Sequence, residues 1–243
     1  PDVPTVTVTA DGVLRAPLSS GEITTSMAFD VLSMGVGSDG TSGFPLVGVY
    51  LTGKELKAAA EVDASVTPLM PAAQLYMAGL DYSFNPHRMF FNRVTDIQLH
   101  QKITATADVE IVDAEGNQMP PPTFTHDFYE EIKDDQLYRV VTGMYSAQML
   151  GTVKSKSLGL LSLEPKMADG SPVTDFEVCI LRDGNGNEIK EWYALAAYLQ
   201  SFGEDGLPGW YASPDGRKHV SRSWNPVELV KSPNWVTLVM LAV

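Results

Sequence analysis

The sequence predicts an α+β fold, with a mixed β-sheet and flanking helices. Candidate strands and helices follow one another without the regular alternation that produces a doubly wound parallel sheet. Hydrophobic residues make up 44% of the 243 residues, which is ordinary for a packed globular core. The sequence shows no internal repeat at the periods typical of solenoid proteins, so a repeat architecture is not expected.

The N-terminal part of the chain contains two expected strands and one expected helix. Thr and Val alternate near the start, so a strand is expected at 3–10. Thr24 or Thr25 can cap a short helix that runs to about Met34. A glycine-rich loop then leads into a strand at 44–51, which is rich in Val and Leu.

The clearest helix start in the sequence is Thr52-Gly53-Lys54-Glu55. A Thr at the N-cap with a Glu three residues later forms a capping box, in which each side chain accepts a hydrogen bond from the other residue's backbone N–H. We therefore expect a helix from this point to about Val62.

The remaining elements follow from apolar periodicity and from turn residues. Strands are expected at 75–82, 94–99, 136–142, 176–182 and 235–243. Helices are expected at 146–163, with breaks at Gly151 and Gly159, and at 188–202; a hairpin is expected at 105–119, turning at 115–117.

Charge and hydropathy exclude two classes of partner. The chain carries 17 Lys and Arg against 30 Asp and Glu, a formal net charge of −13. Such an acidic surface repels phosphate backbones, so no nucleic acid polymer is expected as a partner. The longest apolar segment, 235–243, is far shorter than the roughly 20 residues of a spanning helix, so no membrane span is expected.

The sequence lacks the motifs of a self-contained catalytic centre. The spacing of His87, His100, His126 and His219 excludes the H-x-H and H-E-x-x-H metal pairs. A G-x-S-x-G nucleophile elbow and a Walker loop are also missing, and the single Cys179 excludes two-cysteine metal motifs. We therefore expect no catalytic residue, no metal ligand and no cofactor in this chain. It either binds a ligand or completes a site whose reactive half lies elsewhere.

Five stretches of the sequence resemble, in collinear order, the motifs of one protein family. They are Asp11-Gly-Val-Leu-Arg15 with Gly21-Glu-Ile-Thr24, Ala28-Phe-Asp-Val-Leu-Ser-Met-Gly35, Val47-Gly-Val-Tyr-Leu-Thr-Gly-Lys-Glu-Leu56, Leu75-Tyr-Met-Ala-Gly-Leu-Asp-Tyr82 and Leu137-Tyr-Arg-Val-Val141. The third stretch is the most specific. Together they resemble the C-terminal domain of the 5′-nucleotidase and UDP-sugar hydrolase family.

The resemblance implies a division of labour between two domains. In that family an N-terminal metallophosphatase domain holds two metal ions and performs hydrolysis, while the C-terminal domain supplies the substrate-recognition half of the cleft. The resemblance thus implies that this chain binds a nucleotide or a related phosphorylated small molecule. It also implies an N-terminal metallophosphatase domain of the same polypeptide, which would hold the divalent metal pair, and a location in the extracellular space or the cell envelope.

The family's motifs imply six substrate-binding residues, which are Arg15, Met34, Gly35, Val36, Tyr76 and Tyr145. Arg15 matches the arginine of the first motif, and 34–36 stands where the family has Phe-Gly-Asn. Tyr76 lies two residues after the position of the first base-stacking Phe, on the same face of a strand. Tyr145 is the aromatic residue nearest to the position of the second. Stacking of a base on an aromatic ring contributes roughly 1–3 kcal/mol.

We expect residues 1–243 to form a single domain of this type, with a family-like core at about 3–152 and a lineage-specific extension at about 153–243. The family's Asn and its glycine-rich loop with the second aromatic are both replaced here. A competing hypothesis is therefore a non-catalytic binding or structural module of a secreted protein, with a degenerate site.

Overall fold

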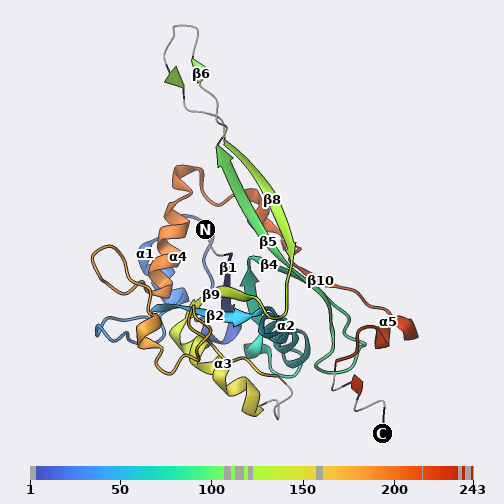
Figure 1. Ribbon diagram of the computed structural model, residues 1–243. Helices are drawn as coiled ribbons and strands as arrows, with labels where there is room; N and C mark the ends of the chain where they lie inside the picture. Colours follow the sequence, from blue (N-terminus) through green and yellow to red (C-terminus); the bar gives the residue numbers. More distant parts are fainter. Residues whose placement is uncertain are drawn as a thin grey trace.

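The computed structural model describes residues 4–106, 111–112, 118–119, 123–156, 161–214, 216–234, 237–238 and 242 (Figure 1). Two four-stranded sheets with flanking helices give an α+β structure, as the sequence predicts. None of the helices in this part of the chain combines the length and the apolar character that crossing a bilayer requires.

The first sheet has the strand order β2, β9, β1, β3. Its strands are β1 (Thr5–Ala10), β2 (Leu46–Thr52), β3 (Leu75–Ala78) and β9 (Leu137–Gly143). The sheet is mixed, because β1 runs parallel to β9 while the other two pairs are antiparallel. Its register places buried valines side by side, since Val6 and Val49 both pair with Val140.

The second sheet has the strand order β10, β4, β5, β8. Its strands are β4 (Leu80–Phe84), β5 (Val94–Thr106), β8 (Thr123–Glu131) and β10 (Lys218–Val220). β5 and β8 project from the body of the molecule, and the short β6 (Ile111–Val112) and β7 (Gln118–Met119) pair with each other near the far end (Figure 1). The turn that the sequence predicts at 115–117 lies outside the described residues.

The single strand that the sequence predicts at 75–82 is divided by Gly79 into β3 and β4, which belong to different sheets. Gly79 has a φ of +87°, a conformation that favours glycine. A Cβ at this position would lie 2.8 Å from the carbonyl oxygen of Thr5. Glycine therefore permits both the turn between the sheets and the close approach to β1.

Five α-helices flank the sheets within the described residues. They are α1 (Thr25–Val31), α2 (Gly53–Glu61), α3 (Met144–Lys156), α4 (Glu191–Gln200) and α5 (Pro226–Val230). Thr24 caps α1, and the predicted capping box of α2 is confirmed. Thr52 Oγ1 accepts from the Glu55 backbone N–H at 3.3 Å, and Glu55 Oε2 accepts from the Thr52 N–H at 2.8 Å.

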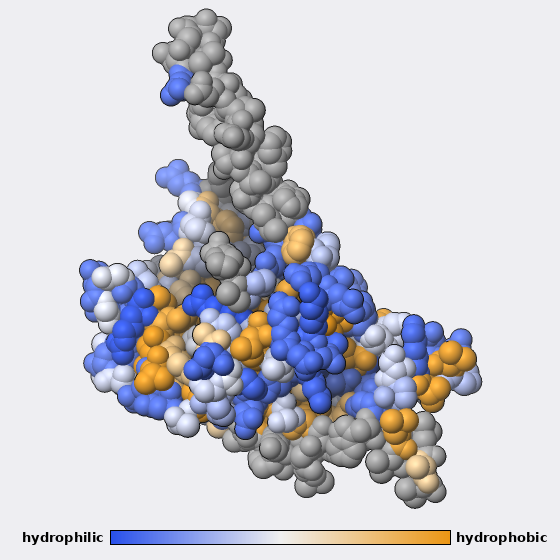
Figure 2. Space-filling view, viewed as in Figure 1, coloured by the Kyte–Doolittle hydropathy of each residue, from blue (hydrophilic) through white to orange (hydrophobic). Residues whose placement is uncertain are grey.

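One hydrophobic core joins the first sheet, α2 and the inner strands of the second sheet. Its largest fully buried side chains are Tyr138, Leu51, Leu56, Leu80, Leu99, Ile132 and Leu163. The free thiol of Cys179 is buried in the same core. Figure 2 shows that hydrophobic side chains also reach the surface around α5, where Val227 and Val230 are exposed.

Three further predictions differ from the structure. Gly151 does not break α3, which runs through it, while Gly159 lies outside the described residues. The strand predicted at 176–182 is wrong, because Glu177–Cys179 forms a 3₁₀-helix and the rest makes only isolated bridges, from Ile180 to Val47 and from Arg182 to Glu188.

The strand predicted at 235–243 is also wrong where the structure describes it. Residues 237 and 238 are helical, and the Leu238 N–H donates to the Asn234 carbonyl. Both errors have one physical cause, because a short apolar run fits a buried turn of helix as well as a buried strand.

Candidate functional site: a groove beside the mixed sheet

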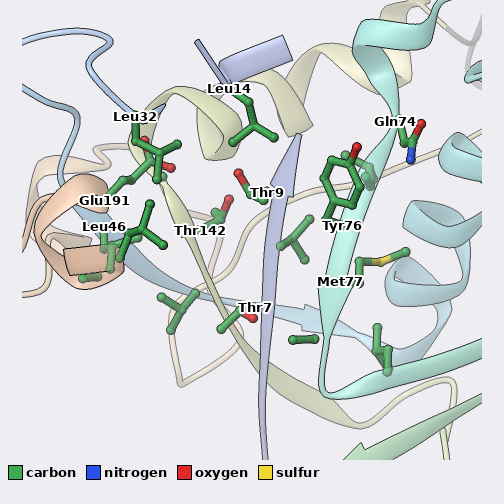
Figure 3. Close-up of a pocket in the computed structure, with 18 of the residues that line it drawn as sticks. Thr7, Thr9, Leu14, Leu32, Leu46, Gln74, Tyr76, Met77, Thr142 and Glu191 are labelled. Carbon is green, nitrogen blue, oxygen red and sulfur yellow. The ribbon is translucent and has the colours of Figure 1, made fainter. Parts of the chain in front are cut away.

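A groove of about 560 Å³ lies against the first sheet (Figure 3). Side chains of β1, β3, β9 and α4 line it, and most of them are apolar, among them Leu14, Leu32, Leu46 and Leu75. This volume is in the range of pockets that hold nucleoside-sized ligands. The arrangement is typical of a binding site, with apolar walls and a few polar groups that can orient a ligand.

Two buried hydroxyls lie on neighbouring strands along this groove. Thr142 on β9 is opposite Val8 on β1, and Thr9 is the next residue of β1. Thr9 Oγ1 and Thr142 Oγ1 are buried and have no hydrogen-bond partner within the described part of the chain. A buried polar atom without a partner is costly. Thr142 shares its face of the sheet with Val8 and Val47, which pack in the core. Thr9 lies on the opposite face with Tyr76, so the Thr9 hydroxyl is the one available to a ligand in the groove.

The Glu191 carboxylate is the third polar group of the groove. It belongs to the first residue of α4, which is only 8% exposed, and no hydrogen bond or ion pair from the described residues reaches its side-chain oxygens. Burial alone raises the pKa of this carboxyl to about 7. Its place requires glycine at 143, because a Cβ there would overlap the carboxylate.

A buried lysine fixes the start of α4 and hence the position of Glu191. Lys190 Nζ donates to Glu188 Oε2 at 2.6 Å and to Asp39 Oδ1 at 2.8 Å, which ties the helix to the glycine-rich loop after α1. The Lys190 hydrogen bond also lowers the pKa of Asp39 to about 2. The Glu191 backbone N–H donates to the Phe44 carbonyl at 3.0 Å.

Tyr76 is the predicted site residue that the structure places in the groove (Figure 3). Its ring is 43% exposed, and its hydroxyl donates to Asp11 Oδ1 at 2.9 Å. Burial, and after it the hydrogen bond to Asp11, raise the pKa of Tyr76, so the phenol is protonated at neutral pH. Gln74, at the position of the family's first stacking Phe, also lines the groove.

Arg15 lies next to the groove rather than in its wall. Its guanidinium donates to the carbonyl of Gly12 and, at 3.3 Å, to the carbonyl of Val13. Its neighbour Leu14 lines the groove, and Arg15 itself is exposed. The guanidinium is thus bonded to its own loop, and the adjacent Leu14 is the residue that reaches the groove.

The other predicted site residues gather around Phe44, outside the groove. The Tyr145 ring stacks on the Phe44 ring with centroids 5.7 Å apart and planes at 21°. Gly35 has a φ of +79°, and a Cβ there would overlap the same ring. Met34 is half-buried beside it, and Val36 is 61% exposed. Leu32, at the end of α1, is the residue of this region that lines the groove.

Two cations at the opposite edge of the groove come from the approach to β10. Arg217 Nη1 donates to the Met77 carbonyl at 3.2 Å. Lys218 Nζ forms an ion pair with Asp63 and lies 5.7 Å from the centre of the Phe84 ring. Glu191 is beside β9 and Arg217 is beside β3, with β1 between them, so a carboxylate and a guanidinium lie at opposite edges of the groove.

Sequence reasoning missed the polar groups that distinguish this groove. Glu191 falls in a predicted amphipathic helix, and Arg217-Lys218 falls in a turn-rich stretch, where neither carries a motif. Thr9 and Thr142 lie in predicted strands. A strand pattern does not indicate whether a threonine hydroxyl has a hydrogen-bond partner. The one signal in the sequence was that two basic residues, Arg217 and Lys218, are adjacent in a chain with only 17 Lys and Arg.

The described residues do not form a metal site. Among them no group of three or more His, Cys, Asp or Glu side chains is placed to hold a metal ion. The family resemblance assigns the metal pair to an N-terminal domain, and no reaction step is assigned to the described residues of this chain.

Comparison with known proteins identifies the family. Residues 3–153 match the family model described as 5′-nucleotidase, C-terminal domain, and the chain therefore belongs to this family. The groove draws β1, β3 and β9 from the matched region, whereas α4 and β10 lie beyond it. Comparison with curated proteins gave no match.

A solved structure supports the same fold. The 5′-nucleotidase precursor from Thermus thermophilus is similar with a TM-score of 0.54 at 20% identity, over 90% of this chain and 32% of that one. The NAD nucleotidase from Haemophilus influenzae matches with a TM-score of 0.47 at 16% identity, over 89% of this chain and 30% of that one. The chain therefore spans about a third of the length of these two proteins.

Proposed function

We propose that this chain is the substrate-recognition part of a 5′-nucleotidase-like phosphoesterase, and that the groove beside the mixed sheet receives a nucleotide or nucleoside. The observation that carries the proposal is the position of Tyr76 in the wall of a nucleoside-sized groove built mainly from the family-matched strands. An exposed tyrosine ring offers a flat face on which a base can stack.

The charges around the groove are consistent with a phosphorylated ligand. The protein as a whole has a formal net charge of −13, so a phosphate needs local positive charge to approach it. Arg217 and Lys218 line the groove, and Arg15 is exposed next in the chain to Leu14, which also lines it. We propose that the base enters the groove and the phosphate stays near these cations.

We propose further that hydrolysis belongs to an N-terminal metallophosphatase domain of the same polypeptide, which acts outside the cytoplasm. Metal-dependent hydrolysis of 5′-nucleotides by the isolated 243-residue chain would contradict the first part. Fractionation of the source cells, with the protein found only in the cytoplasm, would contradict the second.

Calorimetric titration of the chain with nucleosides and nucleoside 5′-monophosphates tests the proposal. We expect saturable binding, weakened about tenfold to hundredfold by Tyr76→Ala, because the stacking contribution of one ring is roughly 1–3 kcal/mol. Tyr193→Ala is the matched control, since Tyr193 is 54% exposed on α4 and is not part of the groove lining. Equal affinity of wild type and Tyr76→Ala would reject the assignment of Tyr76.

A second candidate function is a binding or structural module whose nucleotide site is degenerate. Two observations favour it: Gln74 replaces the stacking Phe in the groove wall, and Tyr145 packs on Phe44 instead of reaching the groove. This alternative predicts no saturable binding of any nucleoside or nucleotide in the same titrations.

A further inference from the structure

Two oxygen-bearing groups without partners among the described residues lie along one groove, the Thr9 hydroxyl on β1 and the Glu191 carboxylate on α4. Figure 3 shows both residues among those that line the groove. Glu191 is only 8% exposed. Native proteins rarely leave such groups unsatisfied, and their place in an apolar groove indicates a site for a ligand.

The chemistry of these groups restricts what that ligand can be. An ionised carboxylate only accepts hydrogen bonds, while a threonine hydroxyl can either donate or accept. The ligand must therefore present N–H or O–H donors at the Glu191 edge. A phosphate or a carboxylate is disfavoured there, because it would bring a second negative charge into a poorly solvated site.

The shape of the groove adds a second restriction. Its walls are mainly apolar side chains, so the part of the ligand that lies between Glu191 and Tyr76 is largely apolar or aromatic. Because Gly143 has no Cβ, the carboxylate can lie directly against the β9 backbone. Both carboxylate oxygens can then contact two neighbouring donor groups on the edge of a planar ligand.

We propose that the groove recognises guanine through the Glu191 carboxylate, which accepts hydrogen bonds from the ring N1–H and the exocyclic N2–H of the base. Guanine is the common base with two N–H donors on adjacent positions of one edge, which matches the two oxygens of a carboxylate. Adenine and cytosine present one donor beside an acceptor on the corresponding edge. The proposal rests on the proposed function, since it specifies which nucleoside that same groove takes.

The Thr9 hydroxyl adds a second contact to this assignment. Guanine carries acceptors at O6 and N7 next to its donor edge, and Thr9 can donate to an acceptor of this kind. Glu191 lies outside the region that the family model matches, so the selectivity would be a property of the C-terminal residues of this chain.

Comparison of guanosine, inosine and adenosine tests the proposal without the contribution of a phosphate. Inosine is guanosine without the N2 amino group. We expect wild type to bind guanosine about tenfold more tightly than inosine, because a hydrogen bond to a charged group contributes enough for a factor of ten or more. Glu191→Gln should weaken guanosine binding by a similar factor and leave adenosine binding unchanged.

A matched substitution separates the local effect from a general change of charge. Glu177→Gln removes one negative charge from an exposed 3₁₀-helix outside the groove and should leave all three affinities as in wild type. Thermal unfolding of both variants verifies that they fold.

Proton release gives an independent readout. Because the carboxyl titrates near neutral pH in the free protein, guanosine binding at pH 7 should release protons, measurable by calorimetry in buffers of different ionisation enthalpy. The other ionisable groups that line the groove are Tyr76, Tyr82, Arg217 and Lys218, and those at the start of α4 are Asp39, Glu188 and Lys190. Glu191→Gln should abolish the release.

The outcomes separate this proposal from the proposed function. Equal binding of the three nucleosides, or a guanosine preference that survives Glu191→Gln, would overturn the role of Glu191 and leave the nucleotide groove in place. No binding of any nucleoside or nucleotide would overturn both.

Discussion

The ionisation of Glu191 should affect the free energy of unfolding in a predictable way. Its pKa is about 7 in the folded chain, against 4.5 as the ordinary value, because burial disfavours the charged form. The folded state therefore holds a proton that the unfolded state has released between these two pH values. The free energy of unfolding should fall as the pH rises from about 4.5 to about 7.

Replacing Glu191 by Gln tests this linkage. The displacement of the pKa corresponds to an effect on the order of 3 kcal/mol. We expect Glu191→Gln to be more stable than wild type by up to about that amount at pH 8, and nearly equal to it below pH 4.5. Urea unfolding at both pH values measures the difference. If Glu191→Gln were equally or less stable than wild type at pH 8, the Glu191 carboxylate could not be buried without a partner.

The limit of sequence reasoning is clearest at individual residues. The position of Tyr76 could be predicted, because strand alternation fixes which face a side chain occupies. The role of Glu191 could not, since its environment is created by the docking of α4 against β9, two elements that are far apart in the sequence. The missing partners of Thr9 and Thr142 likewise arise only from three-dimensional packing.

Local signals predict single elements well where they are strong. The α2 helix begins at the predicted residue, because a capping box is a contact within four consecutive residues. The apolar runs at 176–182 and 235–243 predict strands, but their true conformations depend on what they pack against. Helix propensity also predicts a break at Gly151, but the helix α3 continues through this residue.

The start of α2 should respond measurably to loss of its cap. Thr52→Ala removes the oxygen that accepts from the Glu55 N–H, while Glu55 keeps its ion pair with Lys166 at 2.6 Å. We expect a loss of about 1 kcal/mol in the free energy of unfolding, measured with urea. Thr52→Ser should retain most of the stability. Equal losses in both variants would instead point to the side-chain methyl.

The projecting strands contain a histidine held between two carboxylates. His100 on β5 bonds Asp81 on β4 through Nδ1 and Asp127 on β8 through Nε2, each at 2.9 Å. Burial lowers the pKa of the imidazole, but the hydrogen bonds to Asp127 and Asp81 outweigh it and raise the pKa above 6.5. His100 therefore ties three strands of the second sheet together when it is protonated.

This arrangement gives a pH dependence of defined sign. Because the folded pKa is raised, the stabilisation is fully present below pH 6.5 and is lost as the pH rises through the folded pKa. We expect His100→Gln to be less stable than wild type at about pH 5.5, with a smaller difference at about pH 8.5. Urea unfolding measures both values. If the difference in the free energy of unfolding between wild type and His100→Gln grew with pH, the contacts of His100 with Asp81 and Asp127 would be contradicted.

The fold of the whole molecule could be predicted further than its site. The α+β class follows from the order of the candidate elements, and the family follows from collinear motifs, because these strings encode the capping box and the buried strands. The residues beyond 153 carry no such motif, yet they supply α4 and β10, which close the groove. The central claim is thus that the chain binds its ligand between the family fold and its own C-terminal residues.

Amide chemical-shift mapping of the chain during titration with guanosine 5′-monophosphate tests this claim most directly. We expect saturable shifts that gather at Thr7–Thr9, Gln74–Ala78, Val141–Gly143 and the start of α4, with little change around Phe44 and Tyr145. Saturable shifts gathered around Phe44 and Tyr145 instead, or no saturable shifts at all, would contradict it.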